Sequence, residues 1–167
     1  MIVDWIDLGE IAASGIPLSV QDLHRLCEQG IRAIVTLTED PLTDWAGITS
    51  QILDEVGLTY LHAPINDLCP PDMATVWKVT QFINQMKAQD RPVLLHCFAG
   101  VGRTGTMLHA YYLAEGFSLE AARDKVRAHK PSSQFSLLSH GQRALLENFA
   151  AAKAVVDNLK PMYCRGI

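Results

Sequence analysis

A cysteine and an arginine, six positions apart, stand at the most chemically informative point of the chain. The segment from Val93 to Thr106 reads VLLHCFAGVGRTGT, in which Cys97 is separated from Arg103 by Phe98, Ala99, Gly100, Val101 and Gly102. The two glycines allow a short loop to turn its backbone N–H groups inward, and the loop leads into a helix N-terminus, which favours anions. An arginine fork matches two oxygens of a phosphoryl group. The segment therefore predicts a cradle that holds a phosphoryl group beside a sulfur atom.

The same surroundings predict that Cys97 is ionised. The thiolate is the nucleophilic form of cysteine, and a helix N-terminus or a nearby cation lowers the cysteine pKa from about 8.5 into the range of about 3.5–7.5. His96 stands directly before the cysteine and Thr104 directly after the arginine. A cysteine that only fills space in a core needs none of these neighbours. We therefore interpret Cys97 as a nucleophile.

A dinucleotide-binding turn is the main alternative for this segment, because Gly100, Gly102 and Gly105 also form the pattern G-x-G-x-x-G. In that fold an acidic residue about 20 positions later ends a second strand. Glu120 and Asp124 occupy that zone here, but they lie in a segment predicted to be helical. An arginine inside the glycine turn would also crowd a pyrophosphate. We therefore expect no dinucleotide and no other cofactor.

Zinc is a second alternative, since His62, Cys69, His96 and Cys97 are residue types that bind it. Their spacing fits neither a CxxC nor an HxxxH pair. His96 and Cys97 are neighbours on a predicted strand, so their side chains point to opposite faces. We therefore expect no metal site.

The elements that must position these residues alternate between strands and helices, which predicts an α/β fold with a single domain. Runs of β-branched or apolar residues predict strands over Ile31–Thr38, Leu58–Pro64 and Pro92–His96. Helices are predicted over Ser19–Gln29, Trp45–Val56, the segment that follows Asp72, Arg103–Glu115 and Ser118–His129, with a last helix ending near Asn158. The number of helices in the second half requires helices on both faces of a small central sheet.

The composition of the 167-residue chain excludes several classes of protein. With 49% hydrophobic and 19% charged residues the chain can bury a core, so it is not intrinsically disordered. Its net charge of -4 argues against a nucleic-acid partner. It has neither a basic secretory leader nor a run of 18 apolar residues, so we expect no membrane association. Four cysteines do not make a disulfide scaffold, which favours a cytoplasmic location. Cys164 is fourth from the end, as in a prenylation motif, but Arg165 and Gly166 stand where that motif has aliphatic residues. We therefore do not expect prenylation.

The sequence HCFAGVGRT resembles the HCxxGxxR[ST] signature of the cysteine-dependent protein tyrosine phosphatase superfamily. Two further segments, Trp5–Glu39 and INDLCPP at residues 65–71, are similar to small atypical dual-specificity phosphatases. The resemblance covers about residues 5–150. It implies a central mixed sheet of four or five strands flanked by helices, with a catalytic domain over residues 1–158 and a C-terminal tail over residues 159–167.

The resemblance also implies roles for individual residues. Cys97 would be the nucleophile, and Arg103 with the backbone of residues 98–102 would bind the phosphoryl group. Thr104 would assist departure of the sulfur, and His96 would order the loop. Asp67, 30 positions before Cys97, would be the general acid, whereas its rival Asp72 is better suited to cap a helix.

Three weaker assignments follow from the same resemblance. Glu39 would support Arg103 or lie free in a loop, and Gln142 would position water. Cys69, two residues from the proposed acid, would be either an inert thiol or an oxidation partner of Cys97.

These residues predict a phosphatase that hydrolyses phosphate monoesters through a phosphocysteine intermediate. We expect phosphotyrosine in proteins and small aryl phosphates as substrates, with phosphoserine and phosphothreonine as further candidates, and a monomer by default. No long insertion could build a deep pocket with an aromatic wall, so we expect a shallow cleft. The loop interior has no Lys or Arg besides Arg103, which argues against highly phosphorylated substrates. A phosphatase of phosphoinositides or RNA 5′-phosphates, or a phosphate-binding module without catalysis, stays as an alternative.

Overall fold

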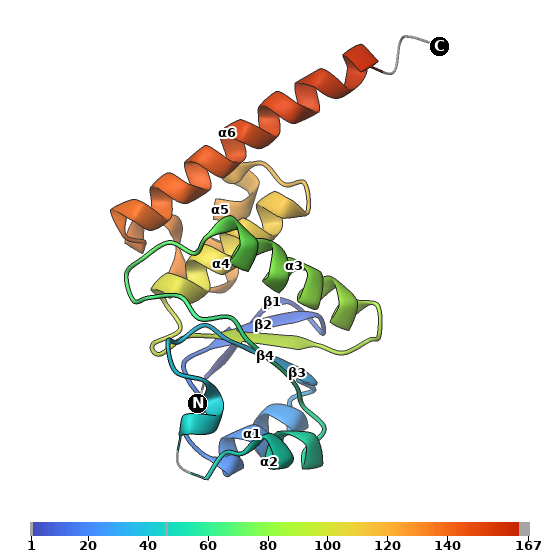
Figure 1. The fold of residues 1–167 in the computed structure, drawn as a ribbon, viewed down its shortest axis with the longest axis vertical. Coiled ribbons are helices and arrows are strands. Elements are labelled where there is room, and N and C mark those ends of the chain that lie inside the picture. The colour runs from blue at the N-terminus through green and yellow to red at the C-terminus, as the bar shows by residue number, and fades with distance from the viewer. Residues whose placement is uncertain (1, 46, 164–167) are drawn as a thin grey trace.

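A five-stranded mixed sheet forms the centre of the computed structural model, which describes residues 2–45 and 47–163 (Figure 1). The strands are β1 (Val3–Asp7), β2 (Ile11–Ser14), β3 (Ala33–Thr36), β4 (Thr59–His62) and β5 (Val93–His96), in the spatial order β1-β2-β5-β3-β4. β1 pairs antiparallel with β2, and the remaining pairs are parallel. The predicted α/β fold and mixed sheet are confirmed.

Helices cover both faces of this sheet, as the sequence predicts. α1 (Val20–Glu28) and α2 (Ser50–Glu55) lie on one face, and α3 (Met73–Lys87), α4 (Gly102–Ala114), α5 (Leu119–His129) and α6 (His140–Tyr163) lie on the other (Figure 1). Alternate strand residues serve the two faces. Ile34 and Leu94 pack into the core under α1 and α2, whereas Val35 and Leu95 pack into the larger core on the opposite face.

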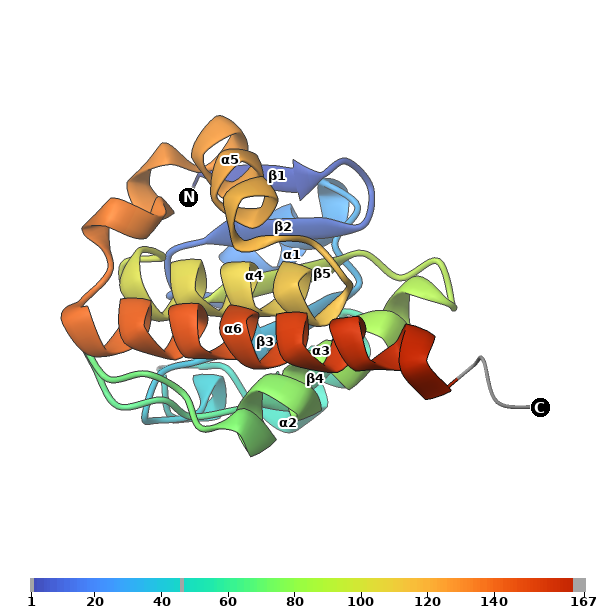
Figure 2. The same cartoon turned by 90° about the horizontal axis from the view of Figure 1, so that it is seen from above.

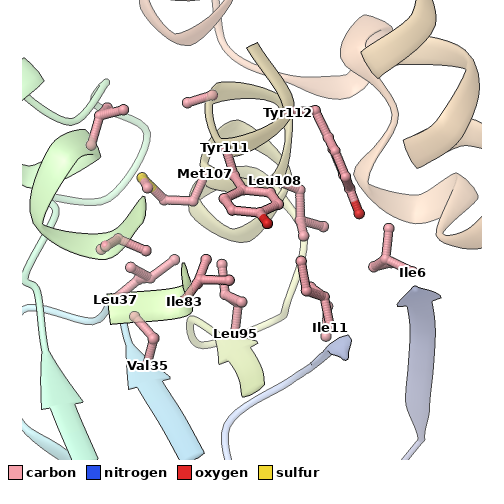
Figure 3. Packing of buried hydrophobic residues seen from close by; sticks show 14 of the residues in the cluster. Ile6, Ile11, Val35, Leu37, Ile83, Leu95, Met107, Leu108, Tyr111 and Tyr112 are labelled. Carbon is pink, nitrogen blue, oxygen red and sulfur yellow. The ribbon is translucent and has the colours of Figure 1, made fainter. Parts of the chain in front are cut away.

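α4 is the helix that places the predicted cradle, and it runs through the larger core. All of its residues from Arg103 to Leu113 are buried, and Figure 3 shows Met107, Leu108 and Tyr111 against the sheet. α6 lies across the outer side of α4 (Figure 2). A helix that is buried on all sides has little freedom to shift, so its first turn is a fixed support for the residues before it.

The carboxyl ends of the four parallel strands meet at one edge of the sheet. Their last residues are in register, with Ser14 and Thr36 both beside His96, and His62 beside Thr36. The segments that follow these strands therefore lie close together, and they contain Glu39, Asp67 and Cys97. Ligands of open parallel sheets bind at this edge.

The predicted elements differ from the structure at the start of α2, at the strands β1 and β2, and at the end of α6. The helix expected over Trp45–Val56 begins only at Ser50, because Gly47 turns the chain with a φ of 81° and Thr49 then supplies the N-cap. The positions of β1 and β2 were not predicted, since both strands are short and neither has a long β-branched run. The last helix continues beyond its predicted end near Asn158 to Tyr163. No glycine stands between these two residues to end the helix.

The described part of the chain has no helix with both the length and the hydrophobicity that a bilayer span requires. Cys164 and the three residues after it lie outside the described residues.

Candidate active site

Residues 97–103 form a tight loop between the end of β5 and the first turn of α4. Two neighbouring segments hold its backbone. The Ile16 N–H donates to the Phe98 carbonyl oxygen at 3.0 Å, and the Ser133 hydroxyl donates to that of Gly100 at 2.9 Å. Gly100 has a φ of 72°, and a Cβ atom there would lie 2.3 Å from the Ser14 carbonyl oxygen. Glycine is therefore required at this position by backbone conformation and by space.

The Cys97 side chain is buried at the base of this loop. Burial by itself raises the pKa of its thiol, but the Thr104 hydroxyl and the backbone N–H groups of Thr104, Val101 and Gly100 act in the opposite direction, and the net pKa is lowered. The Thr104 hydroxyl is buried and has no other hydrogen-bond partner among the described residues, so it is available to the sulfur. This agrees with the predicted thiolate.

His96 is fully buried behind the cysteine. Its Nδ1 lies 3.1 Å from the Cys97 carbonyl oxygen and its Nε2 lies 2.7 Å from the Thr36 hydroxyl. Since a carbonyl only accepts, Nδ1 carries the proton and Nε2 accepts from Thr36. Burial lowers the pKa of His96 to about 4, so the ring is neutral at pH 7. These contacts place His96 against the backbone of Cys97, where it can order the loop.

Arg103 is only 4% exposed, and its two edges have different surroundings. Nη1 donates to the Glu39 carboxylate and to the Ile65 carbonyl oxygen at 3.0 Å, which fixes the guanidinium plane. Nη2 lies 3.4 Å from an Asp67 carboxylate oxygen, and Nε is buried without a partner in the described chain. Buried donors are rarely left unpaired. The free Nε edge therefore has the geometry to receive an oxygen of a bound anion.

Asp67 stands on an exposed loop opposite the cysteine. Its side chain is 68% exposed, and its backbone N–H donates to the second oxygen of Glu39 at 2.7 Å. Glu39 thus bridges Arg103 and the Asp67 backbone, which answers the open question about its place. Asp72 instead accepts from the Thr75 N–H at 2.6 Å as the N-cap of α3, as expected.

Two residues support the loop that carries Asp67, and the sequence does not identify either of them as a support of this loop. The Ser139 hydroxyl donates to the Leu68 carbonyl oxygen, and the Gln142 side chain donates to that of Cys69 at 3.2 Å. Gln142 is buried and also lies against Gly102, so it touches both loops of the site. Cys69 is exposed and does not line the pocket that contains Cys97. No spacing in the sequence indicates the Ser139 contact, because it joins two loops.

A pocket of about 460 Å³ opens above Cys97 and is lined by Glu39, Asp67, Arg103 and two aromatic residues. The aromatic residues are Trp45 and Phe98, whose ring centroids lie 6.2 Å apart. The expectation of a cleft without an aromatic wall is wrong. Its cause is the loop before α2, which was predicted to be helical but instead carries Trp45 to the edge of the pocket.

Comparisons with known proteins show the family to which the chain belongs. Residues 12–117 match the family model described as "Polymorphic toxin system, DSP-PTPase phosphatase". The chain is 27% identical over 146 residues to human dual specificity protein phosphatase 12, covering 87% of this chain and 41% of that protein. It is 26% identical over 148 residues to phosphatidylglycerophosphate phosphatase PTPMT2 of Arabidopsis thaliana, covering 87% of this chain and 62% of that protein. The chain thus spans less than two thirds of these relatives.

The fold also matches solved structures. The crystal structure of Tk-PTP in the active form has a TM-score of 0.76 and 26% sequence identity, covering 89% of this chain and 96% of that one.

Proposed function

Because the chain belongs to the DSP-PTPase family of phosphatases, we propose that it hydrolyses phosphate monoesters at Cys97 through a phosphocysteine intermediate. The observation that carries this proposal is the buried Nε of Arg103, which lacks a partner beside a thiol of lowered pKa. An oxygen of a phosphoryl group would supply that partner. The backbone N–H groups of residues 98–102 would bind the remaining oxygens.

The proposed reaction has two steps. The Cys97 thiolate attacks phosphorus, so that an S–P bond forms while the bond from phosphorus to the leaving oxygen breaks, and Asp67 gives its proton to that oxygen. Asp67, now ionised, then takes a proton from water, whose oxygen attacks phosphorus and displaces the sulfur. Phosphate leaves and the thiolate is restored. Thr104 stabilises the sulfur as it departs.

The aromatic wall favours an aryl ester as the substrate. The phosphotyrosine side chain is long, so the peptide backbone would stay outside the pocket while the phosphoryl group reaches its base. The ring would then lie beside Trp45 and Phe98, where aromatic pairs gain about 0.5–1.5 kcal/mol beyond burial. We therefore place phosphotyrosine first, with phosphoserine and phosphothreonine as further substrates.

The test is hydrolysis of p-nitrophenyl phosphate by the protein and by Cys97→Ser. The expected result is turnover without added cofactor, abolished in Cys97→Ser while inorganic phosphate still binds. Cys69→Ser is the matched control, because that thiol is exposed and outside the pocket, and it should keep its turnover. Turnover that survives in Cys97→Ser would contradict the proposed nucleophile, and phosphate binding without any turnover would point to a non-catalytic module.

A further inference from the structure

A second hollow adjoins the catalytic pocket. It has a volume of about 670 Å³ and lies between the start of β1, the segment of residues 15–22 and the segment of residues 130–132. Phe98 and Ala99 line both spaces, so the two meet over the exposed Phe98 side chain. Leu18 and Ile2 line this side hollow and are strongly exposed. A peptide whose phosphorylated side chain enters the pocket would therefore pass beside this side hollow, whose lining combines apolar side chains with Asp4, Asp22 and Lys130.

Carboxylates greatly outnumber cations around these two spaces. Five acidic residues line them, namely Asp4, Asp22, Glu39, Asp40 and Asp67, against the two cations Arg103 and Lys130. The formal charge of this lining is -3, and Arg25, which lies outside the lining, pairs with Asp22 at 3.5 Å. The lining of the two spaces is therefore net acidic, and its carboxylates form an acidic rim around the site.

Neither cation is available to a part of the substrate outside the pocket. Arg103 and Lys130 are 4% and 5% exposed, and both are paired with carboxylates, Lys130 with Asp4 at 2.6 Å. Asp40, in contrast, is exposed at the rim and has no ion pair among the described residues. Among the described residues that line the two spaces, a negatively charged neighbour of the phosphoryl group meets no unpaired cation, whereas a positively charged one meets Asp40.

We propose, resting on the function proposed above, that the preferred substrate is a phosphotyrosine segment of a protein with Arg or Lys close to the phosphorylated residue. The backbone loop and Arg103 bind the phosphoryl group, the acidic rim binds the flanking cations, and the side hollow takes an apolar neighbour. A lipid headgroup is disfavoured because it lies in an anionic surface, which would repel the acidic rim. Exposed ion pairs are worth about two- to fivefold each, and two flanking cations therefore predict a preference of about tenfold.

The experiment compares kcat/KM for two phosphotyrosine peptides that differ only in flanking Arg or Glu residues. We expect the Arg peptide to be preferred about tenfold at low ionic strength, and the preference to shrink in 0.5 M salt to about twofold, as screening of exposed charges requires. Asp40→Lys should reduce the preference by at least threefold. Asp54→Lys is the matched control, since it makes the same charge change on an exposed residue of α2, away from both spaces.

Two further measurements separate the ways of failing. Failure to hydrolyse p-nitrophenyl phosphate, which has no flanking residues, would overturn the proposed function itself. Hydrolysis of that ester with equal rates for the two peptides, a preference for the Glu peptide, or equal effects of Asp40→Lys and Asp54→Lys would overturn only the acidic-rim proposal. A higher kcat/KM for phosphatidylglycerophosphate in vesicles than for the Arg peptide would likewise overturn it, in favour of a lipid substrate.

Discussion

The Ser139 hydroxyl donates a 2.7 Å hydrogen bond to the carbonyl oxygen of Leu68, across a separation of 71 residues. Leu68 follows Asp67 directly and has a φ of 59°, a left-handed conformation that costs a residue with a side chain roughly 1–2 kcal/mol. Ser139 therefore holds the loop of Asp67 in a conformation that the loop would not favour alone. Ser139 also accepts the Gln142 N–H at 3.2 Å, so the same hydroxyl caps the first turn of α6.

Two substitutions at Ser139 separate these two contacts. Ser139→Ala loses both, and should lower stability by about 0.5–2 kcal/mol and slow hydrolysis of phenyl phosphate about three- to tenfold. Ser139→Asp keeps an oxygen for the helix cap but cannot donate to Leu68, so it should retain stability and still lose the rate. Thermal unfolding and kcat are the measurements, with Ser136→Ala as the control at an exposed serine nearby. Equal rates for Ser139→Asp and the unaltered protein would show that the Leu68 contact does not position the acid.

The leaving group should reveal the role of Asp67. Asp67→Ala removes the proposed proton donor, so it should slow phenyl phosphate, whose leaving group is poor, by about 10²–10⁴-fold, but p-nitrophenyl phosphate much less. Asp72→Asn is the matched control, because asparagine caps a helix as well as aspartate does, and it should leave both rates unchanged. Equal slowing of the two esters in Asp67→Ala would point to a different acid.

The Thr104 hydroxyl should set the pH at which Cys97 reacts. It is one of the groups that lower the pKa of this thiol against the effect of burial. Thr104→Ala should therefore raise the pKa, and the rate of alkylation by iodoacetamide should rise at a higher pH than in the unaltered protein. Thr104→Ser retains the hydroxyl and should restore the original profile. An unchanged profile in Thr104→Ala would assign the lowered pKa to the backbone N–H groups alone.

Buried His96 should make the fold sensitive to mild acid. Its pKa is about 4 in the folded protein because burial disfavours the charged ring, against 6.5 for an exposed histidine. The unfolded chain therefore binds a proton at a pH where the folded protein does not, and the free energy of unfolding falls by about 3 kcal/mol as the pH drops from 6.5 to 4. Denaturant unfolding across this range measures the slope. His96→Asn should be less stable at pH 7 but should show a shallower slope, and an identical slope would exclude His96 as the source.

Gly100 and Gly57 offer a test of the loop geometry. Both have a positive φ, of 72° and 78°, but an added Cβ meets the Ser14 backbone at 2.3 Å in one case and nothing within 4 Å in the other. Gly57→Ala should cost only the backbone strain, about 1–2 kcal/mol. Gly100→Ala adds a steric clash, so it should lose stability beyond this and abolish turnover. Turnover within tenfold of the original in Gly100→Ala would show that the loop tolerates displacement.

The sequence was most informative where local chemistry dictates structure. The β5–loop–α4 segment follows from an apolar run, two glycines and an arginine, and Asp72 and Ser19 cap their helices as their residue types predict. Each of these signals lies within a few residues of the feature that it specifies.

The parts that were missed depend on contacts between distant segments. Nothing near Trp45 indicates that its ring lies beside Phe98, because that placement depends on how the chain crosses the end of the sheet. The support of the Asp67 loop by Ser139 joins two irregular segments in the same way. The sequence leaves the role of Glu39 open, because that role depends on whether the Arg103 side chain reaches the Glu39 carboxylate.

The contacts of Gly100 with Ser14 and of Phe98 with Ile16 have a consequence for how the candidate site forms during folding and is lost during unfolding. The cradle around the nucleophile is closed by a strand from the beginning of the chain, so it is complete only after contacts of long sequence separation have formed, which are the slow contacts in folding. A chain in which β1 and β2 have detached retains the cysteine, the arginine and most of its helices, but not the loop that activates them. Loss of turnover should therefore precede loss of helical circular dichroism during unfolding. A partly folded chain would then have no phosphatase activity toward any phosphorylated molecule.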